Sequence, residues 1–403
     1  MELAARWQNL PLYMFFLDWQ KCYDRIHHKR LVDAVRRMGA PEQYLKVITA
    51  IYSHLTFYVW DQWGTSTVHV QKEGMRQGDP LSCFLLVLLM TVIMLDARAQ
   101  YYDECMRTGL DTTRKQTSEI FGFEDVEFAD DSKFFQMSLP CLRIFIKFYI
   151  LEGRFYGLEA NRDKSVLIVI CAALGVLPRI RHPDGWFFKV EDEAKTLGIV
   201  YGRGFNSAQM LVAGNVGQMY GLMDQYRRVW ATNIALRTKC QYLNSIVRSK
   251  GRWSLHIFHF TKHLKQALDS AQARMLRRIA KIPAAYISRV SHAEVRKRCK
   301  TVSFSTQILK AQFRWLGHVL RRPETHPLRL VCFEPHTDLR PRLTGTHWTK
   351  KRGRPRTDWA QALIALFCTF TQKTRSELCV IVKDKRRYHQ YVERLCGQVE
   401  RNL

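Results

Sequence analysis

Apolar and polar positions in the first part of the chain follow the periods of short strands and amphipathic helices. The apolar run Tyr13–Leu17 predicts a buried strand that ends at a carboxylate, Asp18. Apolar residues at helical spacing then predict two helices, over 27–38 and 41–55, separated at Gly39. A strand followed by two amphipathic helices indicates a mixed α/β domain.

Two hairpins and a long apolar helix are predicted next. Residues 57–60 and 66–70 flank a turn and indicate the first hairpin. The apolar run Cys83–Leu95 has 13 residues, fewer than the roughly 20 that span a membrane, so it predicts a buried helix and no membrane partner. The second hairpin is predicted over 124–136, with Asp130 and Asp131 at its turn. A helix over 140–156 and a strand over 165–170 follow.

Strand patterns fade after about residue 205, where helical patterns rich in Arg and Lys take over. Proline and glycine residues between 323 and 345 interrupt any long helix. We therefore predict three parts: an α/β domain over 1–204 with an antiparallel sheet flanked by helices, a basic helical region over 205–322, and a basic tail over 323–403.

Charge is distributed unevenly between the two halves of the chain. Residues 1–200 hold 24 Lys and Arg against 25 Asp and Glu, whereas residues 201–403 hold 39 against 11. A near-neutral half followed by a strongly basic one is typical of an acid-bearing catalytic domain joined to a part that holds a polyanion. A basic surface that serves only solubility is the alternative.

The eleven cysteines are scattered singly, and the closest two lie 11 positions apart, so no CxxC unit indicates a zinc site. Unpaired thiols indicate an intracellular compartment. The N-terminus has no charged segment followed by an apolar stretch, so no secretory signal is predicted.

Candidate chemistry lies at the ends of two predicted strands, at Asp18 and at Asp130-Asp131. Transfer of a nucleotidyl group uses two divalent cations, and hard cations of this kind bind carboxylate oxygens. Each carboxylate taken alone is more often a cap or turn residue. Their chemistry becomes specific only through the motifs around them.

Four motifs occur in a fixed order: Phe15–Ile26, Gly74–Ser82, Phe128–Asp131 and Gly157–Ser165. With Thr196–Ile199, they resemble motifs A to E of the reverse transcriptases of non-LTR (LINE-type) retrotransposons, over roughly residues 10–205. The resemblance implies a reverse-transcriptase palm followed by a helical thumb, and an activity as an RNA-directed DNA polymerase.

Catalytic roles follow from the resemblance. Asp18 and Asp130 would ligate two Mg²⁺ ions, with Mn²⁺ as a substitute, and Asp131 would be the third carboxylate. Lys164 matches the lysine thought to protonate the departing pyrophosphate, although a solvated surface lysine is an equal alternative.

Nucleotide and template contacts are implied by two further motif segments. Tyr23 matches the aromatic gate against a ribose 2′-hydroxyl, with a purely structural core aromatic as the alternative. The second motif lies against the incoming nucleotide and the template, and its glycine permits close backbone approach. Its candidate residues are Arg76, Gln77, Gly78 and Pro80.

The tail also resembles the segment that follows the polymerase in such elements, through 314–323 and 350–356 with Trp359. Arg352, Arg354 and Arg356 can enter a narrow minor groove, where guanidinium groups meet enhanced negative potential. A nuclear-import cluster and a plain basic loop are equal alternatives.

The predicted function is polymerisation on an RNA template from a DNA primer with deoxynucleoside triphosphates, in the nucleus. About ten residues precede the first motif, so the fingers region of the family is expected to be largely missing and the activity of the chain alone stays open. A fingers or endonuclease segment encoded elsewhere would then be a partner. The alternatives are a catalytically inactive nucleic-acid-binding remnant and an intron-type maturase.

Overall fold

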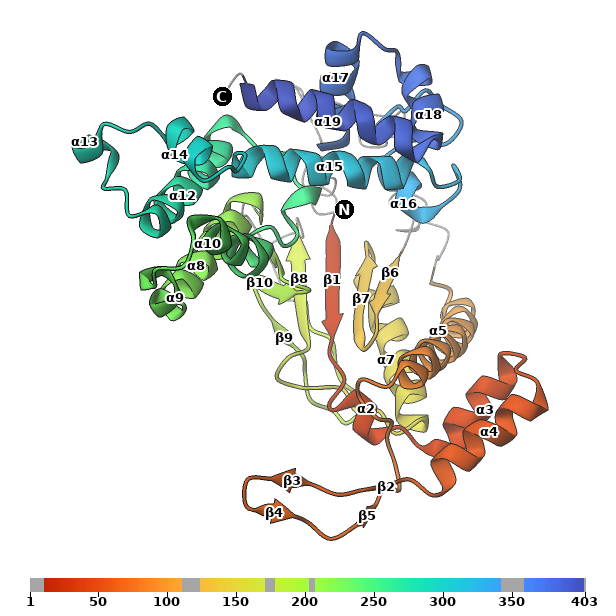
Figure 1. Cartoon of the computed structure of the whole chain (residues 1–403). Helices are drawn as coiled ribbons and strands as arrows, with labels where there is room; N and C mark the ends of the chain where they lie inside the picture. Colours follow the sequence, from red (N-terminus) through yellow and green to blue (C-terminus); the bar gives the residue numbers. More distant parts are fainter. Residues whose placement is uncertain (1–10, 111–123, 171–177, 203–206, 342–358, 402–403) are drawn as a thin grey trace. The chain divides into compact units, whose positions relative to one another are not determined.

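The computed structural model describes residues 11–110, 124–170, 178–202, 207–341 and 359–401. Its chain divides into two compact units, Met1–Ala194 and Lys195–Leu403. Each unit is described by itself below (Figure 1).

The first unit is built on a five-stranded sheet with the order β6-β7-β1-β8-β9. The central strand β1 (Leu12–Leu17) is almost entirely buried and pairs antiparallel with β7 (Asp131–Gln136) and with β8 (Val166–Ile170). At the edges, β6 (Asp125–Phe128) pairs antiparallel with β7, and β9 (Lys189–Val190) pairs parallel with β8. The predicted antiparallel sheet is confirmed, with one short parallel pair added.

Two long helices cover this sheet. The helix α7 (Leu139–Phe155) packs on β7 through edge contacts between Phe134 and the rings of Phe145 and Tyr149, and it lies along α5 (Pro80–Thr108). By length and composition alone α5 could cross a membrane, but half of its apolar window is buried inside the protein, as in the core helices of soluble proteins. Burial of α5 agrees with the predicted core helix.

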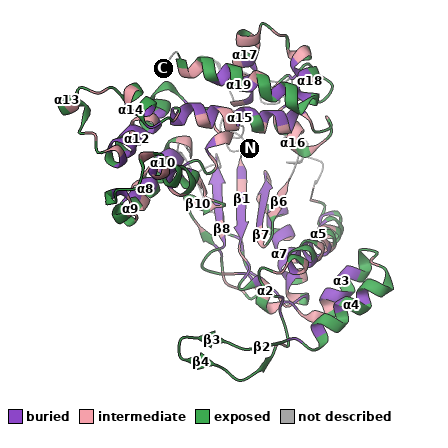
Figure 2. Ribbon diagram, viewed as in Figure 1, coloured by how far each residue is buried: buried purple, intermediate pink, exposed green. Residues whose placement is uncertain are grey.

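The remaining elements of this unit connect the strands. The turn α2 (Cys22–Arg25) leads into α3 (His28–Arg37) and α4 (Glu42–Ser53), close to the predicted bounds. The predicted first hairpin is an exposed arm made of β2 (Thr56–Phe57), β3 (Trp60–Asp61), β4 (Gly64–Thr65) and β5 (His69–Val70), green throughout in Figure 2. A second small hairpin, β10 (Glu193–Thr196) with β11 (Ile199–Gly202), spans the unit boundary in sequence.

The second unit is helical in its described residues after β11. The π-helical turn Leu243–Arg248 and the 3₁₀ turn Leu255–Ile257 interrupt its α-helices. The helices are α8 (Ser207–Gln225), α9 (Arg227–Ala231), α10 (Leu236–Tyr242), α11 (Ser249–Gly251), α12 (Lys262–Ala280), α13 (Ala285–Ser288), α14 (His292–Arg298), α15 (Phe304–Leu320), α16 (Pro327–Leu330), α17 (Trp359–Thr371), α18 (Arg375–Lys383) and α19 (Lys385–Arg401).

The helix α15 joins two apolar clusters of this unit. Its first residues, Phe304 and Ile308, belong to the cluster of α8 to α12, whereas Phe313 and Leu316 belong to the cluster of α17 to α19. The predicted helical region after the sheet is confirmed, while its division at 322 into thumb and tail stays a prediction.

Candidate active site

The register of the central sheet brings the first and third candidate motifs together. Leu17, the last residue of β1, pairs with Ser132 of β7. In sequence, Asp18 follows Leu17, and Asp131 precedes Ser132 as the first residue of β7. Asp130 precedes β7 in the hairpin turn, where Ala129 has a φ of +56°. The antiparallel pairing of β1 with β7 therefore brings the first and third motifs to the same end of the two strands.

The pKa of the buried Cys22 thiol is affected by two of these carboxylates. Burial raises the pKa of Cys22 to about 12, and the negative charges of Asp130 and Asp18 add to the rise. Asp130 and Asp18 therefore both lie within electrostatic reach of Cys22. The same environment keeps the Cys22 thiol protonated and unreactive at neutral pH.

The chemistry of the donor set fits a hard divalent cation, because each candidate ligand is a half-exposed aspartate. Within the described part of the chain, however, no three His, Cys, Asp or Glu side chains are gathered closely enough to hold a metal ion. The aspartates therefore belong to the same end of two paired strands, but their side chains do not form a closed metal-binding site in the described residues.

Asp18 is held by the loop that follows α7. The Asn161 side-chain amide donates to Oδ2 of Asp18 at 2.9 Å, and the backbone N–H of Asn161 donates to the Asp18 carbonyl at 2.8 Å. Ser165 Oγ accepts from the Asp18 N–H at 3.1 Å. Asn161 and Ser165 were absent from the predicted site residues, and the signal that could have identified them is the Asn-x-x-Lys turn before β8.

The same turn positions Lys164. Oδ1 of Asn161 accepts from the backbone N–H groups of Asp163 at 3.1 Å and of Lys164 at 3.3 Å. The Lys164 ammonium then lies 3.8 Å from Oδ2 of Asp18, with 70% of the side chain exposed. The structure thus brings Lys164 to Asp18, and its general-acid role stays a prediction.

Tyr23 lies half-buried between the turn after β1 and the start of α5. Its hydroxyl donates to Sγ of Cys83 at 3.8 Å. Desolvation raises the pKa of Tyr23 to about 12, and the hydrogen bond to Cys83 and the nearby charge of Asp130 add to the rise. Tyr23 is therefore a neutral phenol close to Asp130.

The second motif docks on the turn that carries Tyr23. The N–H of Gly74 donates to the Ile26 carbonyl at 2.8 Å, and the N–H of Met75 donates to the Tyr23 carbonyl at 2.6 Å. Gly74 has a φ of +86°, and a Cβ atom there would lie 2.6 Å from the Asp24 carbonyl oxygen. Only glycine fits this contact.

The predicted nucleotide and template residues follow on the surface at the start of α5. Arg76 donates to the Thr56 carbonyl at 3.3 Å, and Gln77 is exposed. Gly78 has a φ of +89° with open space around a hypothetical Cβ, so its backbone angle rather than packing calls for glycine. Pro80 opens α5 behind Asp79, whose carboxylate accepts from the Leu81 N–H at 3.1 Å.

The predicted tail residues cannot be placed in the same way. Arg352, Arg354 and Arg356 lie outside the described residues. Their proposed contact with nucleic acid stays a prediction.

Comparison with known families decides the class of the first unit. Residues 3–201 match the family described as reverse transcriptase (RNA-dependent DNA polymerase). Residues 3–201 are a reverse-transcriptase domain. The matched range of this domain includes the three aspartates, Tyr23, the 74–82 segment and Lys164. The matched family, reverse transcriptases (RNA-dependent DNA polymerases), agrees with the predicted class of enzyme, whereas the activity of this chain and its retrotransposon type stay predictions.

Solved telomerase structures are distant neighbours of the chain that contains this domain. A Candida tropicalis telomerase in complex with a TWJ fragment of telomeric RNA is 14% identical, with 80% of this chain and 48% of that chain covered and a TM-score of 0.35. A Candida albicans telomerase in complex with a TWJ fragment of telomeric RNA is 11% identical, with 75% of this chain and 47% of that chain covered and a TM-score of 0.32. The chain spans half or less of the length of these telomerases. No curated protein matches it.

Proposed function

We propose that this protein is a retrotransposon-type reverse transcriptase, which extends a DNA primer on an RNA template with deoxynucleoside triphosphates. One observation supports the proposal: within a reverse-transcriptase domain, β1 pairs antiparallel with β7, so Asp18, which follows β1, and Asp130 and Asp131, at the start of β7, belong to the same end of the two strands. Carboxylates at the same end of two paired strands are suited to bind the two metal ions that nucleotidyl transfer uses.

The proposed cofactor is a pair of Mg²⁺ ions, with Mn²⁺ as a substitute, held by Asp18, Asp130 and Asp131. When bound, these ions would activate the primer 3′-hydroxyl and neutralise charge on the triphosphate. The donor set supports this choice, because aspartate oxygens are the ligands that hard divalent cations prefer.

The chain's own residues orient and supply the groups around these ions. Asn161 and Ser165 fix Asp18 through its side chain and backbone, so its carboxylate needs little reorganisation. The Lys164 ammonium, 3.8 Å from Asp18, is proposed to donate a proton to the pyrophosphate leaving group. The neutral ring of Tyr23, close to Asp130, is proposed to restrict the space for a ribose 2′-hydroxyl.

Primer extension by the full chain tests the proposal. With poly(rA) annealed to oligo(dT), dTTP should be incorporated in the presence of Mg²⁺ or Mn²⁺ and not with EDTA. Tight binding of the primer-template without extension under any of these metals would favour the non-catalytic nucleic-acid-binding remnant instead.

A further inference from the structure

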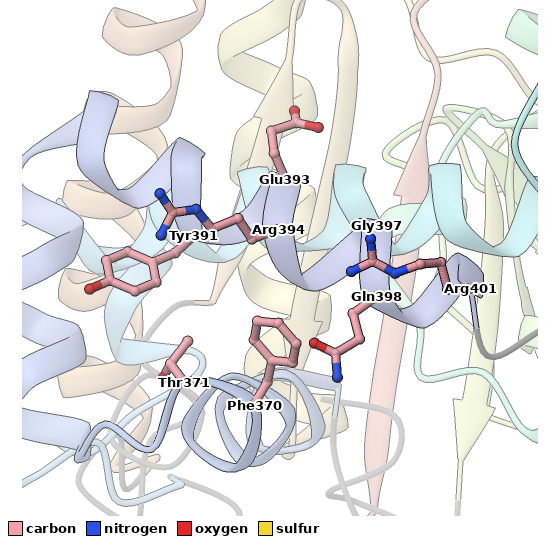
Figure 3. Close-up of a pocket in the computed structure, with 8 residues that line it drawn as sticks. All are labelled: Phe370, Thr371, Tyr391, Glu393, Arg394, Gly397, Gln398 and Arg401. Atoms are coloured by element: carbon pink, nitrogen blue, oxygen red, sulfur yellow. The ribbon is translucent and has the colours of Figure 1, made fainter.

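A groove of about 670 Å³ runs between α17 and α19 in the second unit (Figure 3). It lies in the part of the chain for which sequence predicted only unspecific binding of a polyanion. Two rings, Phe370 and Tyr391, and two arginines, Arg394 and Arg401, line it. The other lining residues are Thr371, Glu393, Gly397 and Gln398.

The carboxylates near this groove are already paired inside the unit. Glu393 forms ion pairs with Lys310 and, at 3.1 Å, with His389. Glu400 accepts hydrogen bonds from Oγ of Ser303 at 2.6 Å and from its backbone N–H at 3.0 Å. The acidic side chains of α19 are thus occupied by neighbours other than the groove arginines.

Arg394 and Arg401 are exposed, and neither has a hydrogen bond or ion pair to any residue that the structure describes. They are seven residues apart, two turns or about 10 Å along α19, and so project from the same side of the helix. The groove therefore offers two uncompensated guanidinium groups to an anionic ligand with more than one charge.

The two aromatic residues of the groove pack against the apolar cluster of α17 to α19. Tyr391 packs against Phe367 of the apolar core, with ring centroids 5.9 Å apart, and Tyr391 and Phe370 are each half-buried. Rings anchored in this way keep part of their surface available at little conformational cost. They provide apolar contact area beside the two arginines.

Gly397 keeps the middle of the groove open. A Cβ atom at this position would meet nothing within 4 Å, although glycine is unfavourable inside a helix. Neither packing nor backbone geometry therefore accounts for glycine here. An occupant that approaches the helix backbone between Arg394 and Arg401 would account for it.

We propose that this groove binds single-stranded nucleic acid, with bases on Tyr391 and Phe370 and phosphates at Arg394 and Arg401. Rings beside unpaired arginines match the way proteins hold single strands without reading sequence. The choice of nucleic acid over an acidic peptide also rests on the proposed function, since a polymerase of this type handles single-stranded template.

Fluorescence anisotropy of the full chain with a labelled 15-mer of oligo(dT) tests the proposal. The double variant Arg394→Ala/Arg401→Ala is compared with Arg386→Ala/Arg387→Ala, which removes the same charge from exposed positions of α19 outside the groove. The groove variant should bind more weakly and reduce the salt slope of log K by about 1.4, because each phosphate contact to a single strand contributes about 0.7, and the control should change both less. Equal losses in the two variants would show a diffuse basic surface and overturn the proposal.

Substitutions at Tyr391 and Gly397 test the rings and the open space of the groove without changing its charge. Tyr391→Leu should weaken binding about 5- to 100-fold with an unchanged salt slope, and Tyr391→Phe should restore it. Gly397→Leu should block binding without loss of charge and favour the helix, so misfolding would not explain the result. Wild-type binding by Gly397→Leu, or equal competition by a poly-glutamate peptide, would contradict the proposal.

Binding is read directly, so the outcome is independent of polymerisation. If the groove variants lose binding while the wild type fails to extend a primer, the groove site stands and the proposed function falls. If the wild type extends a primer and the groove variants bind nucleic acid as tightly as the wild type, the proposed function stands and the groove site falls.

Discussion

At the scale of single residues, Asp18 illustrates what a motif reveals and what it hides. Its place at the end of an apolar strand is by itself more typical of a cap or turn residue, and the motif Phe15–Ile26 around it pointed to a metal ligand. Its contacts with Asn161 and Ser165 depend on a loop some 145 residues away in sequence closing over the strand end. Such contacts arise from tertiary packing and leave only a weak local signal, the turn-forming Asn161.

Asn161→Ala should lower primer extension by about 10- to 100-fold, the usual effect of removing a residue that orients a metal ligand. It should also raise the Mg²⁺ concentration needed for half-maximal rate, since Asp18 would lose its hydrogen bond at 2.9 Å. Gln20→Ala is the matched control, because the exposed Gln20 makes only a backbone contact. An unchanged Mg²⁺ requirement in Asn161→Ala would show that Asn161 only shapes the loop.

Gly74 and Gly78 make a second test at this scale, since both have positive φ but only Gly74 is packed. Gly78→Ala should lower the free energy of unfolding by about 1–2 kcal/mol through backbone strain alone. Gly74→Ala should lower it by about 1–3 kcal/mol more, because its Cβ atom would meet the Asp24 carbonyl. Urea denaturation measures both, and equal losses would mean that the second motif does not dock on the first as described.

At the scale of elements, short apolar runs predicted the strands of the sheet, and apolar residues at helical spacing predicted the helices between them. The parallel strand β9 was missed because it has only two residues, too few for a period. The helices α17, α18 and α19 were also not predicted individually. Their shared apolar cluster with α15 forms across long sequence separations, which periodicity within one segment does not reveal.

The hairpin of β6 and β7 carries a carboxyl group that makes stability depend on pH. Burial raises the pKa of Glu127 to about 7, although its hydrogen bond from the Tyr149 hydroxyl at 2.7 Å acts in the opposite direction. Between about pH 4.5 and 7 the folded protein therefore keeps a proton that the unfolded chain has released. This contribution to stability is complete below about pH 4.5 and is lost as pH rises through 7.

Glu127→Gln, which resembles the protonated form, should therefore be more stable than the wild type at pH 8, by about 1–3 kcal/mol, and nearly equal to it at pH 4.5. Urea denaturation from pH 4.5 to 8 with EDTA measures the difference. Curves that stay parallel over this range would show that Glu127 titrates normally in the folded protein.

At the scale of the whole molecule, the uneven charge coincides with a change of architecture, whereas the predicted roles of the two parts, catalysis and the binding of a polyanion, stay predictions. The near-neutral part holds the five-stranded sheet and the three aspartates, and the basic part is helical in its described residues after β11. The groove between α17 and α19 could not be predicted from the sequence, because its lining comes from two separate helices. Gly397 gives no local signal either, since a Cβ atom there would contact nothing within 4 Å.

The central claim is that Asp18, Asp130 and Asp131 act as one catalytic site. The most direct test is single-turnover primer extension on an RNA template by Asp18→Asn and Asp130→Asn, with Asp103→Asn on an exposed turn of α5 as control. Each site variant should bind primer-template and lose the chemical step by on the order of 10³-fold, since metal catalysis supplies several kcal/mol. The control should extend like the wild type. Extension at the wild-type rate by either site variant would contradict the account.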